Sequence, residues 1–107
     1  MGAISRSIVI TGASSGLGRG LAREMAEPGV GLALLARREQ KLEEVARQVE
    51  AEGAEARVHP VDVREEDAMT EVVRTTHDEF GRLDTVIANA GVSWKTDAHD
   101  LDAQARS

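Results

Sequence analysis

Apolar residues along this chain follow two alternating patterns. Short stretches rich in apolar or β-branched residues predict buried strands at residues 8–10, 30–36, 57–61 and 83–88. Between them, apolar residues lie three or four positions apart, which is the spacing of one helix face. The predicted helices cover residues 16–27, a second segment with its apolar face at 42–49, and residues 65–80. Pro28-Gly29 and Gly53 end the first two helices, because glycine suits the left-handed position past a last helical turn.

This alternation predicts an α/β fold with a parallel, doubly wound sheet and right-handed crossovers. We expect the strand order 3-2-1-4, with the reversal between the first and the fourth strand. Ligands of such sheets bind at the carboxyl ends of the strands, at that reversal. Gly12, Asp62 and Asn89 each follow a predicted strand and are expected to meet there. The predicted domain covers residues 1–92, and the polar, aperiodic residues 93–107 form a tail.

Composition narrows the class of protein. The 107 residues carry 13 Lys and Arg against 19 Asp and Glu, and this net charge of -6 argues against non-specific nucleic-acid binding. Cysteine is absent, and the three histidines lack metal-ligand spacing, so we predict no metal site. No apolar run is long enough to span a bilayer and no signal peptide is visible, so we expect no membrane partner and a cytoplasmic location.

A glycine-rich turn joins the first predicted strand to the first predicted helix. Gly12, Gly16 and Gly18 lie where the first N–H groups of a helix lack internal partners and attract phosphate. No Gly-Lys-Ser/Thr follows, which excludes a Walker loop, and the spacing differs from Gly-x-Gly-x-x-Gly. Ser14 and Ser15 are expected to donate hydrogen bonds to phosphate, and Leu17 belongs to the same site. The alternative is an ordinary strand-to-helix turn that is rich in glycine.

Three motifs together resemble those of the classical short-chain dehydrogenase/reductase family. They are Thr11-Gly12-x-x-x-Gly16-x-Gly18, Asp62-Val63 and Asn89-Ala90-Gly91, and the resemblance covers roughly residues 6 to 93. It implies a partial Rossmann-type, dinucleotide-binding domain. In that family the aspartate accepts a hydrogen bond from the adenine amino group and the next backbone unit supports the ring. The Asn-Ala-Gly motif holds the central sheet together and passes near the cofactor ribose. Alternatively, Asp62 is a cap or a solvated carboxylate and Asn89 a plain turn residue.

The end of the second predicted strand bears on the choice of cofactor. An acidic side chain there usually binds the ribose 2′-hydroxyl of NAD. Here Ala36 is followed by Arg37 and Arg38, and guanidinium groups can pair with a 2′-phosphate. By resemblance these residues imply NADP(H) rather than NAD, although Ser15 stands where many NADP-dependent members carry a second basic residue. The alternative is a solvated, basic helix start.

Residues for catalysis are not found in this chain. The family it resembles uses a Ser with a Tyr-x-x-x-Lys arrangement, whereas this chain has no tyrosine and only Lys41 and Lys95 as lysines. We therefore expect the N-terminal, cofactor-binding half of a short-chain dehydrogenase/reductase, inactive alone. Its complete form would transfer hydride between nicotinamide and a carbonyl or alcohol. The expected partners are the dinucleotide and either a missing C-terminal half or a second copy, bound through the exposed edge of the last strand. A non-catalytic nucleotide-binding module and an assembly module remain alternatives.

Overall fold

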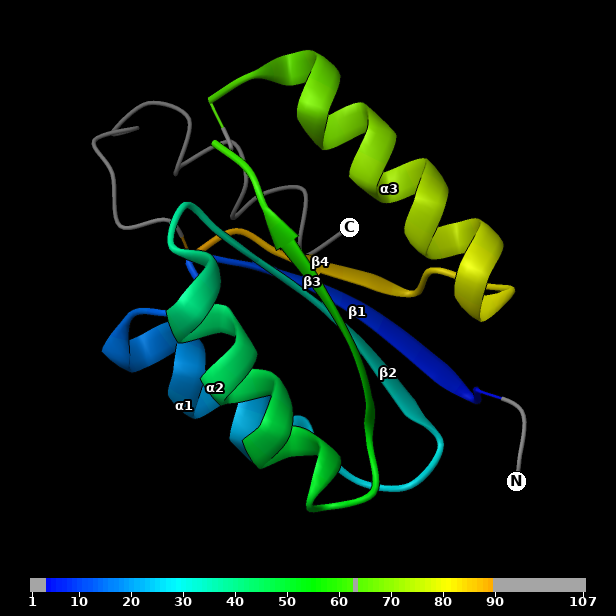
Figure 1. Cartoon of the computed structure of the whole chain (residues 1–107). Coiled ribbons are helices and arrows are strands. Elements are labelled where there is room, and N and C mark those ends of the chain that lie inside the picture. Colours follow the sequence, from blue (N-terminus) through cyan, green and yellow to red (C-terminus); the bar gives the residue numbers. More distant parts are fainter. Residues whose placement is uncertain (1–3, 63, 90–107) are drawn as a thin grey trace.

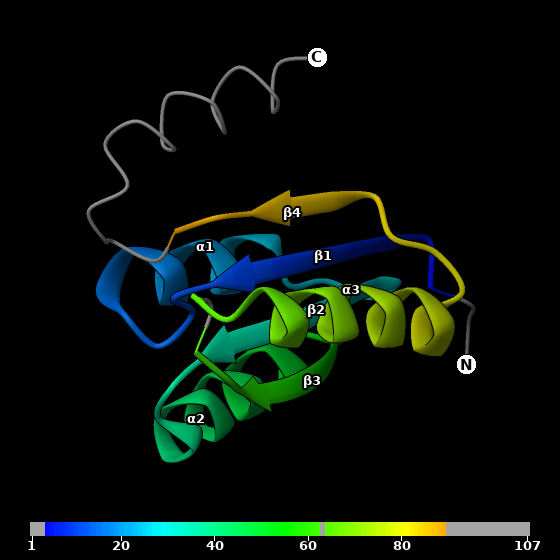
Figure 2. The same cartoon turned by 90° about the horizontal axis from the view of Figure 1, so that it is seen from above.

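The computed structural model describes residues 4–62 and 64–89 (Figure 1). Strands and helices alternate in the order β1 (Arg6–Thr11), α1 (Gly16–Met25), β2 (Val30–Ala36), α2 (Glu39–Glu50), β3 (Glu55–Pro60), α3 (Glu66–Phe80) and β4 (Thr85–Ile87). All four strands pair in parallel in one sheet of order β3-β2-β1-β4, which confirms the predicted α/β topology (Figure 2). The expectations for Val63, Ala90, Gly91 and the tail at 93–107 lie outside the described residues.

Some element boundaries differ from those that the sequence predicts. Helix α1 ends at Met25 rather than near residue 27, because Ala26 is extended and Pro28 disfavours a helical conformation of the residue before it. Strand β3 begins two residues earlier than expected. Strand β4 is shorter than the predicted 83–88, since Leu83 packs beneath α3 and the backbone of Asp84 is engaged by β1.

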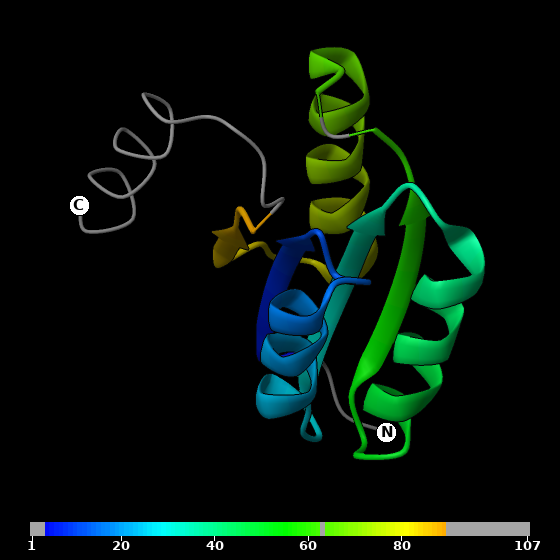
Figure 3. The same ribbon diagram turned by 90° about the vertical axis from the view of Figure 1, so that its left-hand side faces the viewer.

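The sheet is covered on both faces, with α1 and α2 on one side and α3 on the other (Figures 1 and 3). Side chains alternate in direction along a strand, so each central strand contributes to both layers. Ile8 and Ile10 of β1 pack in the layer beneath α1 and α2, whereas Val9 packs with Val72 of α3. Every residue of β2 is buried, as expected of a central parallel strand.

The C-terminal end of α3 is anchored to the sheet through Phe80. A Cβ atom on Gly31 of β2 would lie 2.8 Å from the Phe80 ring, so the glycine makes room for it. The Arg57 guanidinium lies over the Phe80 ring, 5.2 Å from its centroid, and the Arg57 Nε is 3.3 Å from Glu79 Oε1. Gly81 then ends the helix with a φ of 79°, in the left-handed region.

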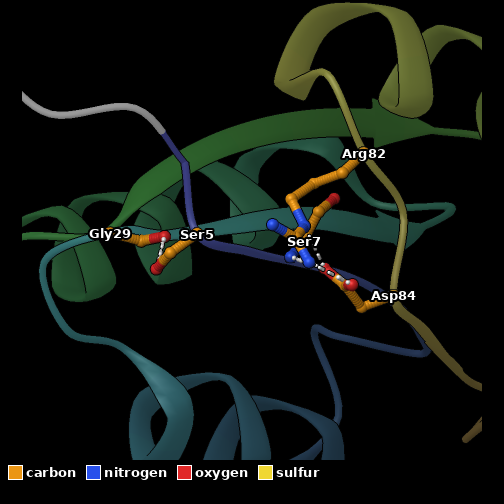
Figure 4. A network of polar contacts seen from close by, with 5 residues as sticks. All are labelled: Ser5, Ser7, Gly29, Arg82 and Asp84. Atoms are coloured by element: carbon orange, nitrogen blue, oxygen red, sulfur yellow. Dashed lines mark hydrogen bonds and ion pairs between the residues drawn. The ribbon is translucent and has the colours of Figure 1, made fainter.

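A polar network joins β4 to β1 at the edge of the sheet where the strands begin (Figure 4). The backbone N–H of Ser7 donates to Asp84 Oδ2 at 2.8 Å, and the N–H of Asp84 donates to the Ser7 carbonyl at 3.0 Å. Arg82 donates from Nε and Nη2 to the two oxygens of the same carboxylate, both at 2.9 Å. The Asp84 side chain therefore adds one further bond to the short β1–β4 ladder and fixes its register.

This network predicts an acid-dependent contribution to stability. Hydrogen bonds from Arg82, and then from Ser7, hold the pKa of the Asp84 carboxyl below its ordinary range. Because the pKa of Asp84 is lower in the folded state, the ionised carboxylate stabilises the fold at pH values above the unfolded-state pKa of about 3.9. This contribution is lost as the pH falls through the folded-state pKa. We expect Asp84→Asn to lower the free energy of unfolding at pH 7, and the difference from the unaltered chain to shrink below about pH 4.

Urea unfolding at several pH values measures this difference. Asp78→Asn makes the same chemical change at an exposed position of α3 and controls for the lost charge. A difference for Asp84→Asn that is as large at pH 3 as at pH 7 would contradict the assignment.

Candidate functional site

The glycine turn after β1 is built around Gly12 and Ser15. Gly12 has a φ of 64°, which lets the chain reverse directly after the strand. Ser15 is the N-cap of α1, and its Oγ donates to the Gly12 carbonyl at 2.8 Å and accepts from the N–H of Gly18 at 3.4 Å. The expected role of Ser15 as a phosphate donor thus competes with a cap that the sequence analysis did not assign. The Ser14 hydroxyl forms no hydrogen bond of this kind with any of the described residues.

The other two glycines of the motif have different surroundings. A Cβ atom on Gly16 would meet no heavy atom within 4 Å. A Cβ atom on Gly18 would collide with the Gly12 carbonyl oxygen and lie 2.9 Å from Asn89 Nδ2. Gly18 is therefore the point where α1 packs against the turn, and Gly16 faces open space. By helix geometry the N–H groups of Gly16 and Leu17 have no partner within α1, and the Leu17 side chain is exposed.

The end of β4 docks on this turn through Thr11. The N–H of Asn89 donates to Thr11 Oγ1 at 2.8 Å, and that hydroxyl donates to the Ile87 carbonyl at 3.4 Å. Asn89 Nδ2 is buried without a hydrogen-bond partner, next to Gly18. In the sequence Thr11 stands out only as part of the glycine motif, and no sequence pattern signals a partner 78 residues away.

Arg37 and Arg38 lie beside the loop that follows β3. The N–H of Val61 donates to the Ala36 carbonyl at 3.0 Å, which extends the β2–β3 pairing by one bond and brings the two loops together. Both arginines are exposed, and neither forms an ion pair with another residue in the described ranges 4–62 and 64–89. Arg38 is the N-cap residue of α2 without a capping side-chain bond, so both guanidinium groups can receive an anion.

Asp62 is paired with Arg64, a residue that the sequence analysis did not single out. Asp62 Oδ1 accepts from the backbone N–H and the Nε of Arg64, both at 3.0 Å, and Oδ2 accepts from Nη2 at 2.8 Å. These bonds, and more weakly the charge of Arg37, hold the pKa of the Asp62 carboxyl well below its ordinary range. The Asp-x-Arg spacing is the sequence feature from which this pairing could have been predicted. Asp62 is therefore an ionised acceptor in a fixed turn.

The sheet brings these groups to one edge. The glycine turn follows β1, the arginines follow β2, Asp62 follows β3 and Asn89 follows β4, as expected for the carboxyl ends of parallel strands. Figure 2 shows α1 beginning on the side to which the arrowheads of β1, β2 and β4 point. The described part of the chain contains no cluster of three or more His, Cys, Asp or Glu side chains able to hold a metal ion. It also contains no helix long and apolar enough to cross a membrane.

Comparisons with known proteins agree with this arrangement. A family model described as short chain dehydrogenase matches residues 6–106. An oxidoreductase of Myxococcus xanthus is 42% identical over 90% of this chain and 38% of its own length. The 11-beta-hydroxysteroid dehydrogenase A of Sesamum indicum is 45% identical over 79% of this chain and 25% of its own length.

Solved structures of short-chain dehydrogenases are also similar to this chain. A metagenomic short-chain oxidoreductase in complex with NADP superposes with a TM-score of 0.76 at 36% identity, over 86% of this chain and 42% of that one. Carveol dehydrogenase from Mycobacterium avium, in complex with NAD, has a TM-score of 0.76 at 28% identity, over 82% of this chain and 36% of that one. The chain spans less than half the length of each of these proteins. The family model and the relatives together show that the chain belongs to the short-chain dehydrogenase family.

Proposed function

We propose that this chain is the NADP(H)-binding portion of an oxidoreductase that transfers hydride between nicotinamide and a carbonyl or alcohol substrate. The observation that carries the proposal is the pair of exposed arginines Arg37 and Arg38, which have no ion-pair partners among the described residues. They lie on the same edge of the sheet as the open glycine turn. Bound cofactor would supply the hydride chemistry. We assign no catalytic residue to this chain, which contains no tyrosine.

The residues of this edge fit the parts of a dinucleotide. The pyrophosphate would lie at the free N–H groups of Gly16 and Leu17, where the helix dipole favours negative charge. Asp62 would accept a hydrogen bond from the adenine amino group, with the Val63 backbone beside the ring. Asn89, with Ala90 and Gly91, would pass near the cofactor ribose.

Arg37 and Arg38 support NADP over NAD as the cofactor. A 2′-phosphate carries negative charge that guanidinium groups can neutralise with paired hydrogen bonds. A carboxylate that would bind the 2′-hydroxyl of NAD is absent from both positions, and Glu39 begins α2 only after them. Bound dinucleotides in the related structures include both NADP and NAD, so the charge at these two positions is the argument for the choice.

Gly16→Val tests the proposed phosphate site. The new side chain would project into the open space in front of the α1 N-terminus, where the pyrophosphate would approach. We expect NADPH binding, measured by calorimetric titration, to be lost, while the helical circular-dichroism signal is retained.

Gly20→Val provides a matched control, because Gly20 lies in the same helix and its Cβ position is also open. The control makes the same glycine-to-valine change within α1 and should still bind NADPH. Binding by Gly16→Val that equals binding by the unaltered chain would show that the turn is structural only.

An assembly role is the second candidate function. Strand β4 pairs with β1 and, among the described strands, with no other, and its Val86 is 46% exposed. An unpaired apolar strand edge is a template for association with a second copy or with another segment. Sedimentation with and without NADPH separates the two candidates, since association that is indifferent to NADPH favours assembly.

A further inference from the structure

Both oxygens of the Asp62 carboxylate accept hydrogen bonds from Arg64. Two donors of Arg64 fill Oδ1, whereas among the described residues Oδ2 receives only Nη2, at 2.8 Å. A carboxylate oxygen accepts up to two hydrogen bonds, so Oδ2 retains one acceptor position. The Asp62 side chain is 28% exposed, so it is partly open to solvent and to a ligand.

The backbone around this pair is also constrained. The N–H of Glu65 donates to the Asp62 carbonyl at 3.0 Å, which closes a turn, and the N–H of Val61 is bonded to the end of β2. A carboxylate that hangs from a fixed turn and is bound by a two-pronged guanidinium has one preferred orientation. Removing the guanidinium leaves the backbone N–H of residue 64 as the one donor from Arg64 to the carboxylate, so the Asp62 side chain is held less firmly while the turn stays in place.

Resting on the proposed function, we propose that Arg64 is a positioning residue for base selection. It orients the Asp62 carboxylate so that the remaining acceptor of Oδ2 meets the 6-amino group of adenine. Adenine donates a hydrogen bond from this group. Hypoxanthine carries a 6-oxo group instead, whose oxygen is an acceptor and is repelled by a carboxylate. The selectivity between the two bases therefore depends on how well the carboxylate is oriented.

The test compares NADPH with reduced nicotinamide hypoxanthine dinucleotide phosphate in calorimetric titrations. We expect the unaltered chain to prefer NADPH, and Arg64→Gln to reduce the ratio of the two affinities by about tenfold, the order of one charge-assisted hydrogen bond. Arg64→Lys retains the charge and loses the planar fork, so it should reduce the ratio as Arg64→Gln does.

Arg74→Gln is the matched control. Arg74 is 66% exposed and Arg64 64% exposed, so the two changes remove the same charge from similarly exposed side chains. The ratio should be unchanged in Arg74→Gln. Thermal unfolding of each variant identifies any that does not fold, and Arg64→Lys then carries the comparison.

The outcomes separate this inference from the proposed function. A ratio that stays constant in both Arg64 variants would overturn the inference, and affinities that fall together in Arg64→Gln but not in Arg64→Lys would show that Arg64 contributes only charge. Failure of the unaltered chain to bind either dinucleotide would overturn the proposed function and this inference with it. A reduced ratio with an unchanged unfolding temperature supports the positioning role, because a merely structural residue would not discriminate between the two bases.

Discussion

Replacing Gly18 by alanine is expected to destabilise the fold, although alanine favours helices more than glycine does. The new methyl group would collide with the Gly12 carbonyl oxygen, a backbone atom that cannot move without displacing the turn. It would also approach the buried amide nitrogen of Asn89. Overpacking of this kind costs about 1–3 kcal/mol, and we expect the upper part of that range because the obstructing atom belongs to the backbone.

Gly20→Ala is the matched control for this prediction. Gly20 lies in the same helix with open space around its Cβ position, so alanine should stabilise the chain by about 0.5–1 kcal/mol. Urea unfolding should therefore give shifts of opposite sign for the two variants. Equal stabilisation by both would mean that α1 does not pack against Gly12 as described.

Replacing Arg37 and Arg38 together by alanine is expected to remove most of the preference for NADPH over NADH. Charge-assisted bonds to a 2′-phosphate contribute about 1–3 kcal/mol, so NADPH affinity should fall by roughly one order of magnitude or more while NADH affinity changes little. The preference of the unaltered chain should also shrink as salt is added, because both guanidinium groups are exposed. Parallel titrations with the two dinucleotides at low and high ionic strength measure both effects.

Arg23→Ala combined with Arg47→Ala is the control for net charge. These arginines are exposed and lie in the last turns of α1 and α2, away from the helix N-termini at the proposed site. The double change should leave the NADPH preference intact. Equal affinity of the unaltered chain for NADPH and NADH would rule out the assignment of the two arginines to a 2′-phosphate.

The sheet could be predicted from sequence because buried parallel strands leave a strong local pattern. Strand β2 has apolar side chains on both faces and is found where it was expected, at Val30–Ala36. Strands β3 and β4 are each paired on one side only within the described part of the sheet, and their predicted ends differ from the structure. Asp84 directly precedes β4 and accepts a hydrogen bond from the Ser7 N–H, and no local sequence pattern predicts that contact.

The candidate site could be predicted as a set of positions but not as a set of contacts. Glycines 12, 16 and 18 are visible as one motif, yet only the position of the Gly12 carbonyl and of Asn89 separates the packing role of Gly18 from the open position of Gly16. The pairing of Asp62 with Arg64 is local, but an Asp-x-Arg spacing does not by itself specify that the two side chains meet.

The order of strands and helices, the parallel sheet and the family resemblance could all be predicted from the amino-acid sequence. These properties follow from periodicity and from motifs that are contiguous along the chain, because burial on one face leaves a repeating signal. The partners of the polar groups, in contrast, are visible only in the folded chain. Thr11 meets Asn89, and Ser7 meets Asp84, across sequence separations of 78 and 77 residues. These bonds exist because β4 lies beside β1 in the sheet, and a hydrogen bond depends on atomic positions that no local pattern specifies.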